Sequence, residues 1–256
     1  MKRIVFFTVV VVCFPAIAES QTKITGLPKE AVIIETKNLR SSNHPNRSLV
    51  LWMVKPKRNP SNIPEDESYT CPDETRGSSY DGPTRVSLVD TSTNTVINTV
   101  KILKDYEEPA DTFNLPYAIR SGYYYYSPKP ERAGAQTRPT ILLLRDYNGD
   151  GKALEFALFD ALACMGLQTT LIGYSERQDR VTHFPINLTV VEDGKRSEQA
   201  LHWADYLFSK QPQRPSYWEY EIDYRGRGGS LDKWQVQYDR SKEQFEAKLT
   251  VVNTEP

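Results

Sequence analysis

The chain has 256 residues, of which 39% are hydrophobic and 25% charged, and its formal net charge is −1 at pH 7. This near-neutral balance gives no electrostatic reason to expect nucleic acid or an anionic membrane surface as a partner. The length is sufficient to bury a sizeable core, in one large domain or two small ones.

The first 18 residues have the layout of a cleavable secretory signal. Lys2 and Arg3 form a basic start, residues 4–18 are almost wholly apolar, and Ala16 and Ala18 are the small residues that a signal peptidase reads. The apolar run is shorter than the roughly twenty residues of a membrane span, and no later segment is apolar enough to span a bilayer. We therefore expect a secreted or periplasmic protein without a transmembrane segment after signal removal.

The sequence of the first half of the mature chain predicts short strands separated by polar loops. Five prolines make residues 55–84 a predicted loop, either a solvated excursion or a binding loop. Runs rich in aliphatic, β-branched or aromatic residues predict the strands: 31–36, 48–54, 85–90 with 96–103 as a hairpin, and 117–126 with its Tyr123–Tyr126 run.

Two cysteines remain once the signal is removed. Cys71 lies beside a polar loop and Cys164 in an apolar stretch. An oxidising compartment permits a disulfide between them, and the long loop that it would close is worth about 4–5 kcal/mol in the chain-entropy model. The alternative is that Cys164 is a buried free thiol that packs as a small hydrophobic residue.

Residues 146–152 read Asp-Tyr-Asn-Gly-Asp-Gly-Lys and form the most informative segment of the chain. Oxygen-bearing side chains fall at alternate positions, and hard cations such as Ca²⁺ prefer six to eight oxygen ligands. The apolar run at 140–144 predicts a strand that leads into this loop. The sequence of residues 153–165 suits either a helix or a strand, and a strand is favoured for Glu155–Phe159.

This segment resembles the Asp-x-Asn-x-Asp-Gly core shared by EF-hand, dockerin and FG-GAP-type calcium loops. The resemblance covers only the loop, so it implies a kind of site and not a family for the whole chain. An EF-hand has a glutamate at its twelfth position, which is Ala157 here, and an FG-GAP loop has an acid at its ninth, which is Leu154. Glu155, one residue later, is the residue that would close a variant ligand set, with Asp160 as a more distant candidate. The resemblance implies a structural Ca²⁺ held by three side chains and one backbone carbonyl: Asp146, Asn148, Asp150 and Lys152.

The alternative interpretation of the same segment is a plain hairpin turn. Asn148-Gly149 and Asp150-Gly151 are pairs that supply the positive φ angles of tight turns without any metal. Two other turns, Tyr174–Asp179 and Tyr238–Glu243, resemble each other weakly, each with an aromatic strand end before a polar turn. That similarity is typical of ordinary hairpins.

The C-terminal third predicts an antiparallel meander. Apolar and aromatic residues alternate with polar ones in the runs 218–224, 234–238 and 245–251, which indicates three strands with one buried face. This alternation predicts that Trp218 and Trp234 are core residues, with an exposed ligand platform as the alternative.

Apolar residues at helical spacing, with Ser197 as a cap, predict one short helix near residues 197–210. We therefore predict a mainly β protein, an antiparallel sandwich or an incomplete propeller-like array with one short helix. Residues 19–256 would form a single domain, with a subdivision near 105–135 as the alternative.

The sequence contains no recognisable catalytic constellation. The three histidines sit in unrelated contexts, and neither a zinc-ligand spacing nor a Gly-x-Ser-x-Gly motif is present. Carboxylates are plentiful but cannot be paired for acid–base chemistry without geometry. The sequence predicts a non-catalytic binding or structural module with a Ca²⁺-stabilised loop and a carbohydrate or protein ligand. The alternative is a secreted hydrolase that acts on carbohydrate.

Overall fold

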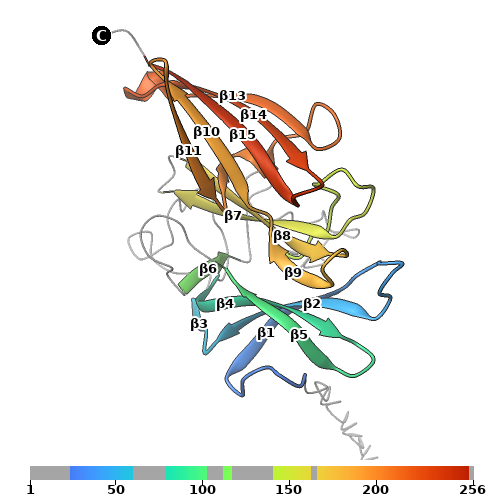
Figure 1. The fold of residues 1–256 in the computed structure, drawn as a ribbon. Coiled ribbons are helices and arrows are strands. Elements are labelled where there is room, and N and C mark those ends of the chain that lie inside the picture. The colour runs from blue at the N-terminus through green and yellow to red at the C-terminus, as the bar shows by residue number, and fades with distance from the viewer. Residues whose placement is uncertain (1–23, 60–78, 103–111, 117–140, 163–165, 254–256) are drawn as a thin grey trace, which may run out of the picture.

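The described part of the chain is built almost entirely from β-strands (Figure 1). The predicted signal segment, the predicted strand at 117–126 with its Tyr123–Tyr126 run, Cys71 and Cys164 lie outside this part, so the predictions made for them stay predictions. The computed structural model describes residues 24–59, 79–102, 112–116, 141–162 and 166–253.

The N-terminal sheet has the strand order β1-β2-β4-β3, and β5 and β6 also pair with β4. All of these pairings are antiparallel, and β2 is almost fully buried on both faces. The predicted 85–90 and 96–103 hairpin is confirmed as β4 and β5. The bounds are β1 Ala31–Asn38, β2 Arg47–Val54, β3 Lys57–Asn59, β4 Ser79–Asp90, β5 Thr95–Lys101 and β6 Thr112–Pro116.

Two further sheets follow. The four-stranded sheet has the order β12-β8-β7 with β9 on β8, and the five-stranded sheet has the order β11-β10-β15-β14-β13. In the latter, β10 and β15 run parallel, whereas the other pairs are antiparallel. The bounds are β7 Glu155–Leu162, β8 Gly166–Ser175, β9 Arg180–His183, β10 Ile186–Glu192, β11 Lys195–Leu201, β12 Ala204–Asp205, β13 Tyr217–Asp223, β14 Leu231–Asp239 and β15 Gln244–Val252.

The four-stranded sheet is the middle layer of the molecule (Figure 1). On β7, Phe156 and Leu158 pack into a core shared with the N-terminal sheet, whereas Ala157 packs into a core shared with the five-stranded sheet. Successive residues of a strand point to opposite faces, so one strand serves both cores. None of the three sheets closes into a barrel within the described residues, and the arrangement fits a β-sandwich.

The predicted C-terminal meander is confirmed. Strands β13, β14 and β15 pair in sequence order, and Trp218 and Trp234 are only 1% and 2% exposed. Their partners include Phe245, which is fully buried and meets the Trp218 ring at a centroid distance of 5.8 Å. The prediction that these two tryptophans are core residues is therefore confirmed, and the alternative of an exposed platform is wrong for them.

The predicted helix near residues 197–210 is wrong. Residues Lys195–Leu201 form β11, and only Leu207–Ser209 form a single 3₁₀ turn, labelled η1. The reason lies just upstream, where Asp193 and Gly194 adopt positive φ angles of 48° and 75° between the paired residues Glu192 and Lys195. Such a two-residue Asp-Gly turn drives a hairpin, and pairing with β10 overrides the helical spacing.

Two other expectations need correction. The loop predicted for residues 55–84 contains β3 and the beginning of β4 at its ends. The strand predicted at 140–144 is wrong for its described residues, 141–144, which form no strand; only the next residue, Arg145, makes an isolated bridge, to Glu155. By contrast, the strand favoured at Glu155–Phe159 is confirmed as part of β7.

Candidate functional site

The acidic loop, residues 146–154, is closed at its base by one antiparallel bridge. The backbone N–H of Arg145 donates to the carbonyl of Glu155 at 2.8 Å, and the reverse bond is 3.3 Å long. Glu155 is also the first residue of β7, so the loop leads directly into the middle sheet. The loop is thus anchored at one end by a strand whose first four residues, 155–158, are buried.

Asp146 organises the turn of the acidic loop. Its Oδ1 accepts the backbone N–H groups of Gly149 at 2.7 Å and Asp150 at 3.1 Å, and its Oδ2 accepts that of Gly151 at 2.8 Å. Gly149 and Gly151 have φ angles of 72° and 88°, which residues with a side chain rarely adopt. Positive φ at these glycines was expected for a plain turn and for a calcium loop alike.

The next two polar side chains repeat this pattern. Asn148 Oδ1 accepts the N–H of Asp150 at 3.0 Å, and Asp150 Oδ1 accepts the N–H of Lys152 at 2.8 Å. The carbonyl of Lys152 accepts the N–H of Leu154 at 3.1 Å, while its ammonium group pairs with Glu176. Each side chain therefore bonds the backbone two residues ahead, which turns alternate side-chain oxygens toward the loop itself.

Glu155 lies beneath the loop and is fully buried. Its Oε2 accepts the backbone N–H of Tyr147 and its Oε1 accepts the side-chain amide of Asn148, both at 3.0 Å. The pKa of Glu155 is raised to about 9, mainly by burial and in part by the negative charges of Asp150 and Asp146, against the lowering effect of the Tyr147 hydrogen bond. The carboxyl group is therefore protonated at neutral pH in this conformation.

The close approach of β8 to Glu155 depends on Gly173. A Cβ atom at this position would lie 2.7 Å from both Glu155 Cα and the Leu154 carbonyl oxygen, which is too short for any contact. We expect Gly173→Ala to lower the free energy of unfolding by about 1–3 kcal/mol, as in other overpacked sites. Urea denaturation measures this change. Gly226→Ala is the control, because no atom lies within 4 Å of its Cβ position; equal effects of the two substitutions would contradict the prediction.

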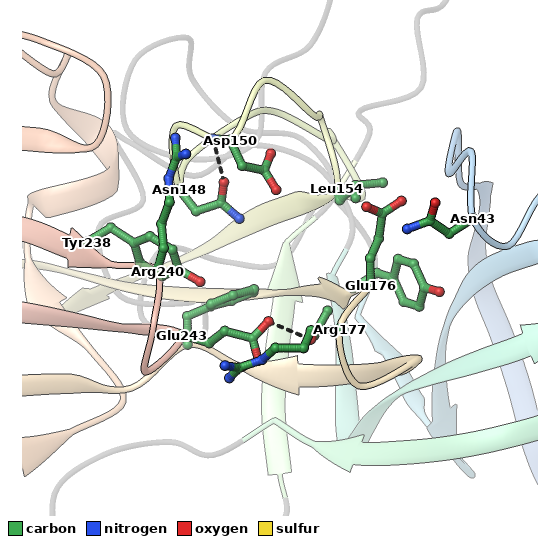
Figure 2. Close-up of a pocket in the computed structure, with 12 residues that line it drawn as sticks. Asn43, Asn148, Asp150, Leu154, Glu176, Arg177, Tyr238, Arg240 and Glu243 are labelled. Atoms are coloured by element: carbon green, nitrogen blue, oxygen red, sulfur yellow. Dashed lines mark hydrogen bonds and ion pairs between the residues drawn. The ribbon is translucent and has the colours of Figure 1, made fainter.

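The acidic loop forms one wall of a cleft of about 350 Å³ (Figure 2). The other walls come from the turn between β8 and β9 and from the turn between β14 and β15, and Asn43 lies at one side. Arg240 from the second turn donates to the carbonyl of Gly149, which ties that turn to the acidic loop. The charged or amide side chains that line the cleft are Asn43, Asn148, Asp150, Glu176, Arg177, Arg240 and Glu243.

The two glutamates of the cleft are held in their charged form. Burial opposes ionisation of Glu243, but hydrogen bonds from Ser175, Gln178 and Arg177 outweigh it and hold the pKa of this carboxyl below its usual range. For Glu176, burial is likewise outweighed by the hydrogen bonds from Lys152 and Ser41, so its pKa is also lowered. Both glutamates in the cleft walls are therefore anions paired with cations, Glu176 with Lys152 and Glu243 with Arg177.

The structure brings together all five residues predicted as metal ligands, but not as a finished ligand set. Asp146, Asn148 and Asp150 line the turn, and Glu155 lies beneath it. Over the ranges that the structure describes, no group of three His, Cys, Asp or Glu side chains is placed to hold a metal ion. In this conformation the loop bonds its own backbone N–H groups.

Sequence reasoning missed the cleft residues on the two turns. Glu176 and Arg177 follow β8, whereas Arg240 and Glu243 follow β14, and more than sixty positions separate the pairs along the chain. The only available signal was the weak similarity between Tyr174–Asp179 and Tyr238–Glu243. These two turns meet across the cleft, where Arg177 donates to Glu243 at 2.8 Å.

Comparison of the chain with models of protein families, with curated proteins and with solved structures finds no match. In the described part of the chain, no helix has both the length and the hydrophobicity to cross a membrane.

Proposed function

We propose that this protein is an exported, non-catalytic binding or structural module in which Ca²⁺ stabilises the acidic loop beside the cleft. The observation that supports the proposal is the position of two acidic side chains, Asp146 and Asp150, on one tight turn above the buried Glu155, although the three do not form a ligand group in this conformation. Asp146 and Asp150 are close enough to Glu155 to raise its pKa. A divalent cation would stabilise the ionised form of Glu155 beside the two aspartates and hold the loop against β7.

The chemistry of the donor set suits a hard cation. Carboxylate and amide oxygens are the ligands that Ca²⁺ prefers, and carbonyl oxygens carry two lone pairs, so an accepted N–H does not preclude coordination. Asp146, Asn148 and Asp150 would supply side-chain oxygens, Lys152 its carbonyl oxygen, and Glu155 a carboxylate once the ion lowers its pKa. Calcium sites that work outside the cytosol can have a Kd of roughly 10⁻⁴–10⁻³ M, so an incomplete ligand set is tolerable.

The character of the cleft favours binding over hydrolysis. A glycosidase needs one carboxyl group that is protonated at working pH and faces the substrate. In the described cleft, Glu176 and Glu243 have lowered pKa values and cationic partners. Glu155 has the raised pKa of a proton donor, but its side chain is fully buried beneath the loop. A polar ligand bound through these charged groups is the better fit.

Thermal unfolding with Ca²⁺ and with a chelator tests the calcium proposal. If Kd lies in the extracellular range, millimolar Ca²⁺ in excess of Kd should raise Tm by about 3–10 °C relative to chelator. Asp150→Asn keeps an acceptor for the Lys152 N–H but removes one negative charge, so it should lose most of this shift. Calorimetric titration with CaCl₂ measures the same affinity directly.

The matched control is Asp239→Asn. Asp239 makes similar bonds, to the N–H groups of Ser241 and Lys242, in a turn outside the acidic loop. This variant should respond to Ca²⁺ like the unmodified protein. Equal Tm values in saturating Ca²⁺ and in chelator would leave the loop as a plain turn and remove the calcium proposal.

A further inference from the structure

His183, the last residue of β9, has one ring nitrogen fixed by the backbone of the N-terminal sheet. Its Nε2 lies 2.6 Å from the carbonyl oxygen of Lys101, the last residue of β5. A carbonyl can only accept a hydrogen bond, so Nε2 carries the proton and donates it. In the neutral ring, Nδ1 then presents an unprotonated lone pair.

The Nδ1 atom of His183 is an unsatisfied acceptor in the described structure. It is buried and has no hydrogen-bond partner among the described residues. Burial lowers the pKa of His183, and the neighbouring His202 lowers it further, against the effect of the Lys101 carbonyl. The ring is therefore neutral near pH 7, and an unsatisfied buried acceptor of this kind is unfavourable unless something binds it.

A second imidazole lies beside the His183 ring. His202 lies exposed in the link between β11 and β12, and its ring centroid is 5.4 Å from that of His183, with the ring planes inclined by 53°. Two imidazoles bound to one tetrahedral ion, each with a metal–nitrogen distance of about 2 Å, have ring centres roughly 5 Å apart. The distance between the two rings is that of two histidines bound to one metal ion, and the inclination of their planes is not that of stacked rings.

We propose that His183 and His202 form a binding site for a divalent transition-metal ion of the zinc and copper class. Imidazole nitrogen selects such ions over Ca²⁺ and Mg²⁺, so this site is separate from the acidic loop. The hydrogen bond to the Lys101 carbonyl orients His183, as a backbone carbonyl does for many metal-bound histidines. The described residues contribute no third His, Cys, Asp or Glu to a cluster, so water completes the coordination and exposed His202 gives the ion access.

Zinc binding to the tag-free full chain tests the proposal. Calorimetric titration with ZnCl₂ should give one ion per chain that depends on both imidazoles. His183→Asn and His202→Asn should each lower the affinity by at least about tenfold, since even the loss of an orienting partner costs that much. His44→Asn is the control, because His44 lies beside Asp179 instead, and it should leave the zinc affinity unchanged.

A second measurement uses the unmodified protein and therefore does not depend on whether the histidine variants fold. In NMR spectra of the unmodified protein, Zn²⁺ should shift the ring signals of His183 and His202 and leave those of His44 in place. Asp150→Asn should retain zinc binding, which separates this site from the calcium proposal. No zinc binding at millimolar concentration, or affinity that survives both histidine substitutions, would overturn the proposal.

Discussion

Raising the pH from about 5 to about 9 should destabilise the protein through one buried side chain, Glu155. The pKa of Glu155 is about 9 in the folded state against an ordinary value of 4.5. The folded state therefore keeps a proton that the unfolded state releases. The resulting stability is complete below pH 4.5 and is lost as the pH rises through 9, with a slope of up to about 1.4 kcal/mol per pH unit.

Glu155→Gln isolates this contribution. Glutamine does not ionise, and its carbonyl oxygen can still accept the Tyr147 N–H that now bonds Oε2. Urea denaturation at a series of pH values should give a shallower decline for the variant than for the unmodified protein. The comparison also removes the opposite effect of His183, whose lowered pKa makes stability rise with pH near its titration. Identical slopes for the two proteins would mean that Glu155 is not protonated in the folded state.

Phe245→Ala should be among the most destabilising substitutions in the five-stranded sheet. The Phe245 ring is fully buried, and it meets the rings of Tyr238, Phe208 and Trp218 at centroid distances of 5.0, 5.3 and 5.8 Å. Its removal leaves a cavity that three rigid rings cannot close. We expect the free energy of unfolding to fall by about 3–5 kcal/mol, as measured by urea denaturation.

Two further variants on this strand make the result interpretable. Phe245→Leu keeps most of the volume and should cost less than the alanine variant. Val252→Ala, at a position on the same strand that is 41% exposed, should change stability by only about 0.5 kcal/mol. A loss below about 1 kcal/mol for Phe245→Ala would show that the aromatic rings are not closely packed.

The parts of the fold predicted correctly are those with a short-range signal. The meander from Trp218 to Val251 was predictable because alternate residues of a strand point to the same face, so apolar residues at every second position indicate one buried face. The 197–210 segment failed because its apolar spacing also suits a helix, whereas the deciding signal was the Asp193-Gly194 turn in front of it. Tertiary pairing with β10 then outweighs helix propensity, which is weak.

In the candidate site, too, the local features were predictable from the sequence and the long-range contacts were not. The acidic loop was predictable because Asp146, Asn148 and Asp150 act within one turn, and their bonds to the backbone are local. The cleft was not predictable, because Glu176 and Glu243 meet only when the turns of two different sheets come together. The histidine pair was hidden for the same reason, since nineteen positions along the chain separate His183 from His202.

The place of β15 in its sheet has a consequence for the order of folding. This final strand lies in the centre, parallel to β10 on one side and antiparallel to β14 on the other. During synthesis, the β10–β11 and β13–β14 hairpins emerge first and have no partner to join them. The sheet can assemble only after its last strand has left the ribosome, so a nascent chain must keep two open strand edges from associating with other molecules until then.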